Sequence, residues 1–210
     1  MQDRPSRIAT ASIYRAGAWL KGSRALAQET PVALTYQGST YAVMMASPAD
    51  LENFALGFSI TEGLVASADE IISLEVAHLD NGLELRMWLA DQRAEIFQAR
   101  QRHLAGPTGC GLCGIESLDQ ALRLLPQVSA GQKIMGHDVI AALRALPAMQ
   151  QLNRETASVH AAGFWDGQKL AFVREDVGRH NALDKLCGAM VQANCDPAAG
   201  LIVLSSRISV

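Results

Sequence analysis

Two cysteines, Cys110 and Cys113, are separated by two residues inside a glycine-rich stretch, residues 106–114. Four of these nine residues are glycine, and Leu112 is the one large apolar side chain among them. Glycine packs little and loses much backbone entropy on ordering, so such a run is typical of an adaptable loop rather than of a core element. The sequence therefore predicts a loop that presents two thiols, and sulfur chemistry is the first function to consider.

The surroundings of the two cysteines favour reactive thiols. A cysteine is nucleophilic only as its thiolate, which is stabilised at helix N-termini and beside cationic groups. The pair lies directly before residues 115–125, whose apolar spacing predicts a helix. Three side chains that can carry positive charge, Arg100, Arg102 and His103, lie shortly upstream. The two cysteines are therefore the candidate catalytic residues.

A zinc site and a pair of inert thiols are the alternatives to a reactive pair. A four-cysteine zinc site would have to include Cys187 and Cys195, whose separation of eight residues is unusual for zinc ligands. His160 lies in an alternating strand pattern, where a hydrogen-bonded core histidine is the more common case. Zinc deaminases place a glutamate two residues after such a histidine, and here that position is Ala162. We therefore expect no deaminase chemistry and assign no metal ligand.

Residues 174–185 carry a second dense group of polar side chains, running from the end of a strand through a glycine turn into a helix. Helical spacing places four of them on one polar arc: His180, Asn181, Asp184 and Lys185. With Arg179 at the start of the helix, this arrangement can hold an anion or a phosphate. The alternative is a solvated helix face on which His180 and Asp184 form a pair one turn apart.

The composition limits the class of protein. The chain has 210 residues, 49% hydrophobic and 19% charged, which is enough for one large domain or a main domain with a smaller lobe. A net charge of −3 gives no general case for nucleic acid binding. We see no run with the length of a membrane span and no secretory signal. Four cysteines are too few for a disulfide framework, which fits a reduced, cytosolic setting.

Apolar periodicity and turn signals divide the chain into four parts. Residues 1–30 are expected to be poorly ordered, and residues 31–105 to form an N-terminal α+β lobe. Residues 106–114 form the CxxC loop, and residues 115–210 an α/β core. Predicted strands cover residues 32–36, 40–45, 71–77, 83–89, 158–165, 169–173 and 201–204. One predicted helix begins at Ser47-Pro48, and three others cover residues 115–125, 137–149 and 181–191.

Several stretches of the sequence match the motifs of a known family and occur in the same order along the chain. They are residues 45–51, 57–58, 61–63, 109–114, 159–162, 175–185 and 206–209. The chain resembles the FdhD/NarQ family of formate dehydrogenase accessory sulfur carriers, and the resemblance spans residues 29–210. The GCGLCG stretch together with EDVGRHNALDK makes it specific.

The resemblance implies a cytosolic sulfurtransferase that takes persulfide sulfur from a cysteine desulfurase. The sulfur would pass to the molybdenum or tungsten bis-guanine-dinucleotide cofactor before that cofactor enters formate dehydrogenase. In the family the first cysteine of the pair, here Cys110, is taken as the persulfide carrier, and Cys113 would assist or resolve. The cofactor is then a ligand and substrate, and we expect no permanently bound metal, no nucleic acid and no membrane among the partners.

The family run over residues 175–185 coincides with the polar arc, so we expect the cofactor to bind there. Its anionic part would contact four residues: Arg179, His180, Asn181 and Lys185. Three carboxylates would be available to the amino groups of guanine: Glu175, Asp176 and Asp184. The implied fold is α/β, a cytidine-deaminase-like α/β sandwich with a mixed sheet, plus a smaller N-terminal α+β lobe.

Family members continue for several tens of residues beyond residues 206–209, so the resemblance implies that the C-terminal part of the core is missing here. Residues 201–204 are apolar on both alternating faces, which predicts a central strand covered on both sides. We expect this region to pair in a homodimer, or the 210-residue chain to be less stable than a longer version.

Two functions from other classes remain open. One is a thioredoxin-like dithiol oxidoreductase, because Cys-Gly-Leu-Cys has that motif's spacing, although no clear apolar strand leads into it. The other is a zinc-stabilised chaperone of the apo-dehydrogenase that catalyses no reaction. Reduction of insulin would favour the first, and stoichiometric zinc that is lost on Cys110→Ser would favour the second.

Overall fold

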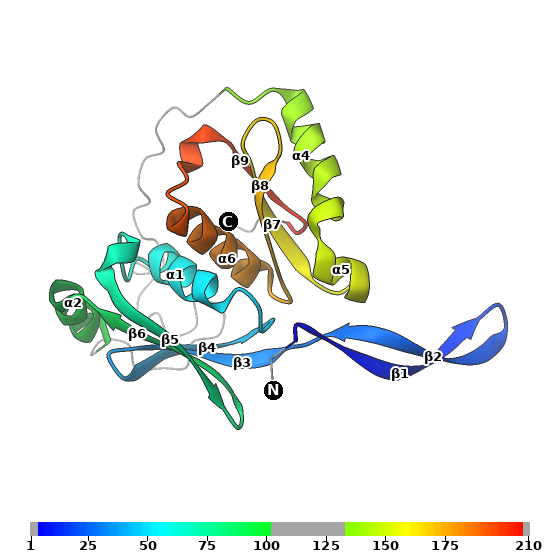
Figure 1. Cartoon of the computed structure of the whole chain (residues 1–210), viewed down its shortest axis with the longest axis horizontal. Helices are drawn as coiled ribbons and strands as arrows, with labels where there is room; N and C mark the ends of the chain where they lie inside the picture. Colours follow the sequence, from blue (N-terminus) through cyan, green and yellow to red (C-terminus); the bar gives the residue numbers. More distant parts are fainter. Residues whose placement is uncertain (1–3, 102–132, 208–210) are drawn as a thin grey trace.

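The computed structural model describes residues 4–101 and 133–207 (Figure 1). The CxxC loop over residues 106–114 and the helix predicted over residues 115–125 lie outside the described residues. The strands are β1 Ser6–Arg15, β2 Ala18–Ala27, β3 Thr30–Tyr36, β4 Ser39–Ala46, β5 Ile71–Leu79, β6 Gly82–Leu89, β7 His160–Trp165, β8 Leu170–Asp176 and β9 Leu201–Leu204. The helices are α1 Leu51–Thr61, α2 Asp91–Gln101, α4 Gly136–Met149, α5 Gln151–Thr156 and α6 Arg179–Gln192, with short 3₁₀ turns at Ala68–Glu70 and Pro197–Ala199.

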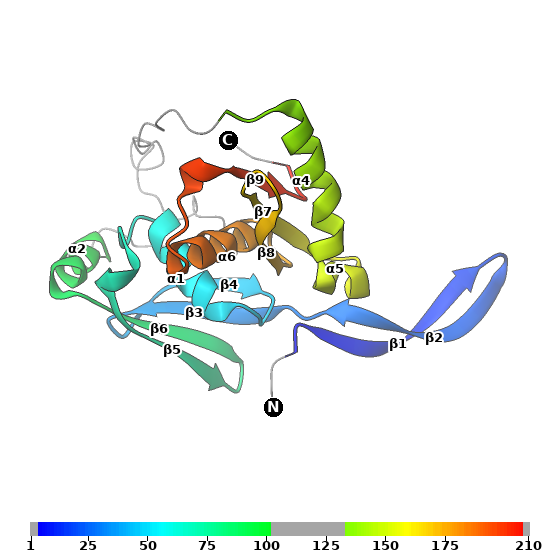
Figure 2. The same cartoon turned by 45° about the horizontal axis from the view of Figure 1, so that its top comes forward.

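Two sheets enclose a pair of helices. The strand order is β4-β3-β6-β5 in one sheet and β8-β7-β9 in the other. Figure 2 shows α1 and α6 between the two sheets and α4 on the outside of β7, β8 and β9. The first sheet is mixed, because β3 and β6 run parallel while its other neighbours are antiparallel. The α/β class with a mixed sheet is therefore confirmed, with the mixed sheet in the N-terminal half and an antiparallel sheet in residues 160–204.

Each layer is held by its own group of buried side chains. Phe54 and Phe58 of α1 pack on the mixed sheet. Leu186 of α6 packs on one face of β7 through Phe164, and Leu146 of α4 belongs to a cluster on the other face. Burial of both faces of β7 explains its short, almost wholly apolar sequence.

Helices α1 and α6 cross with their backbones in contact. A Cβ built on Gly57 of α1 would overlap the carbonyl oxygen of Asp184 in α6. A Cβ built on Gly188 of α6 would likewise overlap the carbonyl oxygen of Asn53 in α1. Glycine is therefore required at both positions, and this crossing joins the two halves of the fold.

The structure differs from the expected lack of order in residues 1–30. Strands β1 and β2 form an antiparallel hairpin with ten paired positions on each strand. Ala16 and Gly17 make its turn with φ of 51° and 82°, and two positive φ values are the mark of the turn that suits a two-residue hairpin. The dipeptide Ala-Gly is not among the usual signals for this turn, so the sequence did not predict it.

Strand β9 also differs from its prediction. It pairs with β7 alone among the described strands and so lies at an edge of that sheet. Val203 is buried, whereas Ile202 is 45% exposed. Its apolar sequence reflects contact with α4 on one face and partial exposure on the other, so the prediction of a central strand is wrong for the described residues.

Candidate functional site

The polar segment predicted to bind a ligand lies where β8 ends and α6 begins, with Val177 and Gly178 between them. Strand β8 carries the segment's first residues to the edge of the antiparallel sheet, and α6 carries the rest back between the two sheets (Figure 2). Some residues of this segment therefore lie in the interior of the protein, and others lie at the end of the antiparallel sheet.

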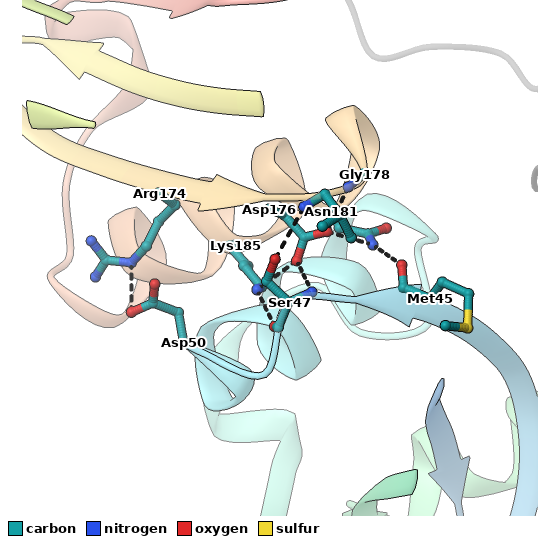
Figure 3. Close-up of polar contacts among 9 residues, drawn as sticks. Met45, Ser47, Asp50, Arg174, Asp176, Gly178, Asn181 and Lys185 are labelled. Atoms are coloured by element: carbon teal, nitrogen blue, oxygen red, sulfur yellow. Dashed lines mark hydrogen bonds and ion pairs between the residues drawn. The ribbon is translucent and has the colours of Figure 1, made fainter. Parts of the chain in front are cut away.

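Asp176 is the centre of a buried polar network (Figure 3). Its Oδ2 accepts hydrogen bonds from the backbone N–H of Ser47 at 2.9 Å and from Lys185 Nζ at 2.6 Å. Its Oδ1 accepts from the N–H of Gly178 at 2.7 Å and from Asn181 Nδ2 at 3.0 Å. A carboxylate that accepts this many hydrogen bonds is held in one orientation, and the turn after β8 is fixed with it.

The partners of Asp176 also bind the loop that follows β4. Asn181 Nδ2 donates to the carbonyl oxygen of Met45, and Lys185 Nζ donates to that of Ser47 at 2.8 Å. The Ser47 hydroxyl accepts from the N–H of Val177 at 3.1 Å. Asp176 and Lys185 are both fully buried. Three of the expected ligand contacts, Asp176, Asn181 and Lys185, are therefore positioning residues in this structure.

Glu175 points to the opposite face of β8 from Asp176, as alternation along a strand requires. Its two carboxylate oxygens accept from the backbone N–H groups of Leu152 and Asn153, both at 2.8 Å. These N–H groups belong to the first turn of α5, where helix amides lack partners of their own. Glu175 therefore anchors α5 to the sheet and does not lie with the residues that begin α6.

Two of the expected residues, Arg179 and His180, remain outside the buried network. They begin α6, whose N-cap Gly178 has no side chain to accept a hydrogen bond from the first amides. The Nε of Arg179 is buried and has no hydrogen-bond partner among the described residues. Partial burial, followed by the positive charges of Arg179 and Arg207, holds the pKa of His180 below its ordinary value. An anion at this point would satisfy these donors and relieve the repulsion between the cations.

Arg207 joins this group through the topology of the sheet. Strands β8 and β9 both run antiparallel to β7, so their carboxyl ends lie at the same end of the sheet. Ser205, directly after β9, is fixed there by hydrogen bonds in both directions with the backbone of Ala161. Ligands of α/β proteins commonly bind outside the carboxyl ends of strands. Sequence reasoning missed Arg207, although it lies in one of the stretches that carried the family resemblance.

Asp184 lies apart from the cations, on the side of α6 that faces α1. Its Oδ1 accepts a hydrogen bond from the Thr61 hydroxyl at 2.8 Å. Desolvation is the largest influence on its carboxyl group and, with the charges of Glu62 and Asp176, raises the pKa to about 7 against the lowering effect of Thr61. A carboxyl group with a pKa near 7 is partly protonated at neutral pH and so differs from an ordinary surface carboxylate.

The raised pKa of Asp184 predicts that this carboxyl group lowers the stability of the fold when it is ionised, and Asp184→Asn should remove that effect. Because the folded state binds the proton more tightly than the unfolded state, the contribution of Asp184 to stability is largest below pH ~4 and is lost as the pH rises to about 7, by up to ~4 kcal/mol. Asp184→Asn should therefore raise the melting temperature at pH 8 and change it little at pH 4. The exposed Asp80→Asn is the control with the same charge change, and an equal effect of both variants at pH 8 would contradict the prediction.

The two cysteines within the described residues are unsuited to nucleophilic chemistry. Burial raises the pKa of Cys187 to about 11, with a smaller contribution from the charge of Asp184. The pKa of Cys195 is also raised, by desolvation first and then by nearby carboxylates. A thiol that resists ionisation is a poor nucleophile. Cys110 and Cys113 lie outside the described residues.

The described residues were also searched for groups of metal-binding side chains and for helices that could cross a membrane. His160 begins β7, paired in register with Asp176, and is half-buried. No group of three or more His, Cys, Asp or Glu side chains among residues 4–101 and 133–207 is arranged to hold a metal ion. In the same residues, no helix combines the length and the apolar character that crossing a membrane requires.

Comparison with known proteins places the chain among its relatives. Residues 27–210 match the FdhD/NarQ family. The chain is 50% identical over 206 residues to sulfur carrier protein FdhD of Agrobacterium fabrum, covering 97% of this chain and 76% of that protein. It is 42% identical over 212 residues to the protein of the same name from Bordetella petrii, covering 98% and 76%.

Among solved structures, the fold is similar to that of a formate dehydrogenase accessory protein from Desulfotalea psychrophila. The TM-score is 0.67 at 21% identity, with 97% of this chain and 74% of that chain covered. The structural likeness concerns the fold, whereas the sequence matches extend over nearly the whole chain. Together with the matched residues 27–210, they show that the chain belongs to the FdhD/NarQ family.

Proposed function

We propose that this protein is a cytosolic sulfur carrier that transfers persulfide sulfur to a guanine-dinucleotide metal cofactor destined for formate dehydrogenase. The Cys110 thiolate would attack the outer sulfur of a desulfurase persulfide, forming Cys110–S–SH and releasing the desulfurase thiolate. Delivery of the outer sulfur to the molybdenum or tungsten at the sulfide level takes two electrons, which Cys113 would supply by forming a disulfide with Cys110 as the sulfur leaves. Relatives at 50% and 42% identity that are named sulfur carriers support the proposal.

The observation that carries the ligand half of the proposal is a group of hydrogen-bond donors, two of them arginines, at the end of the antiparallel sheet. Arg179, His180 and Arg207 gather at an uncapped helix N-terminus, and no acidic side chain among the described residues forms an ion pair with them. The diphosphate of a guanine dinucleotide is an anion that fits such a site. Residues 174–185 would thus bind the cofactor through Arg179 and His180, while the network of Asp176 holds them in place.

Sulfur loading tests the carrier step directly. After incubation with a cysteine desulfurase and cysteine, intact-mass analysis should show a gain of one sulfur atom, about 32 Da, which a thiol reductant removes. Cys110→Ala should abolish the gain, because the acceptor thiolate is lost, and Cys113→Ala should retain it. A gain that survives Cys110→Ala but not Cys113→Ala would reverse the assignment of the carrier cysteine.

Guanosine diphosphate provides a convenient mimic for the ligand site. Arg179→Ala should weaken its binding roughly 10- to 100-fold at fixed salt, as expected when a charge-assisted hydrogen bond to phosphate is lost. Arg207→Ala should act in the same direction. Arg144→Ala removes the same charge from the exposed surface of α4 and should leave the affinity unchanged. Equal affinity for Arg179→Ala and the parent protein, measured by calorimetry, would rule out this site.

A further inference from the structure

His160 is the first residue of β7, the central strand of the antiparallel sheet. Because β8 and β9 both run antiparallel to β7, the start of β7 lies at the end of the sheet where those two strands finish. This is the end that carries the proposed ligand site. His160 pairs with Asp176 on one side, and on the other side Ser205 is bonded to the backbone of Ala161, the next residue of β7. His160 therefore lies in the middle of this end of the sheet.

The side chain of His160 lies on the face of β7 that α6 covers. Alternation along a strand places residues 160, 162 and 164 on one face. Ala162 and Phe164 belong to the buried cluster that packs on α6, whereas Ala161 belongs to the cluster around α4. His160 thus continues the row of side chains under α6, one step beyond Ala162 toward the end of the sheet.

Arg179 approaches the same corner from the helix. Ala182 of α6 shares a buried cluster with Ala162, and Arg179 lies one turn before Ala182 on the same helix face. The step from Ala182 back to Arg179 and the step from Ala162 back to His160 both lead toward the end of the sheet. The Nε of Arg179 is buried there without a hydrogen-bond partner among the described residues. An imidazole and a guanidinium therefore flank one corner of the fold.

The His160 imidazole has no partner of its own in the part of the chain that the structure describes. No hydrogen bond or ion pair joins the half-buried ring to residues 4–101 or 133–207. Asp176, its neighbour across the ladder, already accepts four hydrogen bonds from other groups. The described residues therefore do not supply the hydrogen bond expected of a core histidine, and the ring keeps its N–H donor available to a ligand or to water.

We infer that His160 is a further ligand-contact residue, which donates a hydrogen bond to the diphosphate of a guanine nucleotide from the sheet side of the site. The inference rests on the proposed function, because the ligand is the one that Arg179 and Arg207 are proposed to bind. A diphosphate offers acceptor oxygens in several directions, so donors on the first turn of α6 and on β7 can contact it from two sides.

Substitutions at His160 separate a hydrogen-bond donor from a packing group. His160→Phe keeps a ring but removes the donor, so it should weaken the binding of guanosine diphosphate roughly 10-fold in calorimetry at fixed salt. His160→Gln places an amide N–H near the position of Nε2, and its affinity should stay within about 3-fold of the parent's. His137→Phe is the matched control, because it changes an exposed histidine of α4, and it should leave the affinity unchanged.

Nuclear magnetic resonance shows whether the ring lies against the ligand. The chain has five histidines, and the His160 imidazole signal is the one that disappears in His160→Phe. Guanosine diphosphate should shift this signal and leave that of His137 in place. Guanosine, which lacks phosphates, should shift it far less.

The outcomes distinguish the role of His160 from the site as a whole. Binding that Arg179→Ala weakens but His160→Phe leaves unchanged would overturn the role of His160 while the proposed site stands. Equal losses of affinity in His160→Phe and His160→Gln, or a His160 signal that the nucleotide does not shift, would show a packing role and overturn the inference as well. A parent protein that does not bind guanosine diphosphate would overturn the proposed site, and this inference with it.

Discussion

Gly57→Ala is expected to lower the free energy of unfolding by at least about 3 kcal/mol, the upper part of the range for overpacked cores. The added methyl group would overlap the carbonyl oxygen of Asp184, so α1 and α6 would have to separate. Helix propensity acts in the opposite direction, because alanine stabilises an exposed helix by roughly 1 kcal/mol relative to glycine. The sign of the change therefore reports whether the backbones touch.

Urea denaturation followed by circular dichroism measures this change. Gly136→Ala at the start of α4 is the matched control, because no atom lies within 4 Å of the Cβ it would add. It should be neutral or slightly stabilising. If Gly57→Ala were as stable as the parent protein, the close crossing of α1 and α6 would be wrong, and with it the joint between the two halves of the fold.

Lys185→Met should be similarly damaging, for an electrostatic reason. The substitution leaves the fully buried carboxylate of Asp176 without its cation, which costs about 3–5 kcal/mol. It also removes the hydrogen bond to the carbonyl oxygen of Ser47. Because this network fixes the turn that carries Arg179, we expect the affinity for guanosine diphosphate to fall as well, in protein that is still folded.

Two further variants separate the charge effect from simple packing. Lys169→Met removes an exposed lysine from the turn directly before β8 and should leave stability unchanged. Adding Asp176→Asn to Lys185→Met removes the unpaired buried charge, so the double variant should be less destabilised than the sum of the two single variants. Strict additivity in chemical denaturation would show that the two side chains do not act as a pair.

Much of the fold follows from local sequence patterns. Strands were predicted over residues 158–165 and 169–173, and the structure joins β7 and β8 through a turn between them, with Asp166 accepting two backbone N–H groups. The helix over residues 181–191 lies within α6. These predictions succeed because turns and amphipathic helices depend on interactions between residues close in the chain. The β1–β2 hairpin was missed because its Ala-Gly turn and its exposed strands lack those local signals.

Partners distant in the sequence explain where local reasoning failed. Ser47 was predicted to begin a helix, but α1 begins at Leu51, with Asp50 as its N-cap in the left-handed region. The Ser47 hydroxyl instead accepts from Val177, a residue 130 positions away. A side chain that can cap a local helix can equally bind a distant backbone amide, and the sequence pattern is the same in both cases.

The sequence by itself identified the CxxC pair, the polar segment of residues 174–185 and the family to which the chain belongs. The tertiary structure decided which members of that segment are available to a ligand. Asp176, Asn181 and Lys185 are enclosed because α6 packs against the loop after β4, whereas Arg179 and His180 remain at the end of the sheet, where β9 brings Arg207 near them. Residue type sets which chemistry a side chain can perform. Burial and pairing depend on elements far apart in the sequence, so only the folded chain shows which side chains hold the turn after β8 in place and which can bind a ligand.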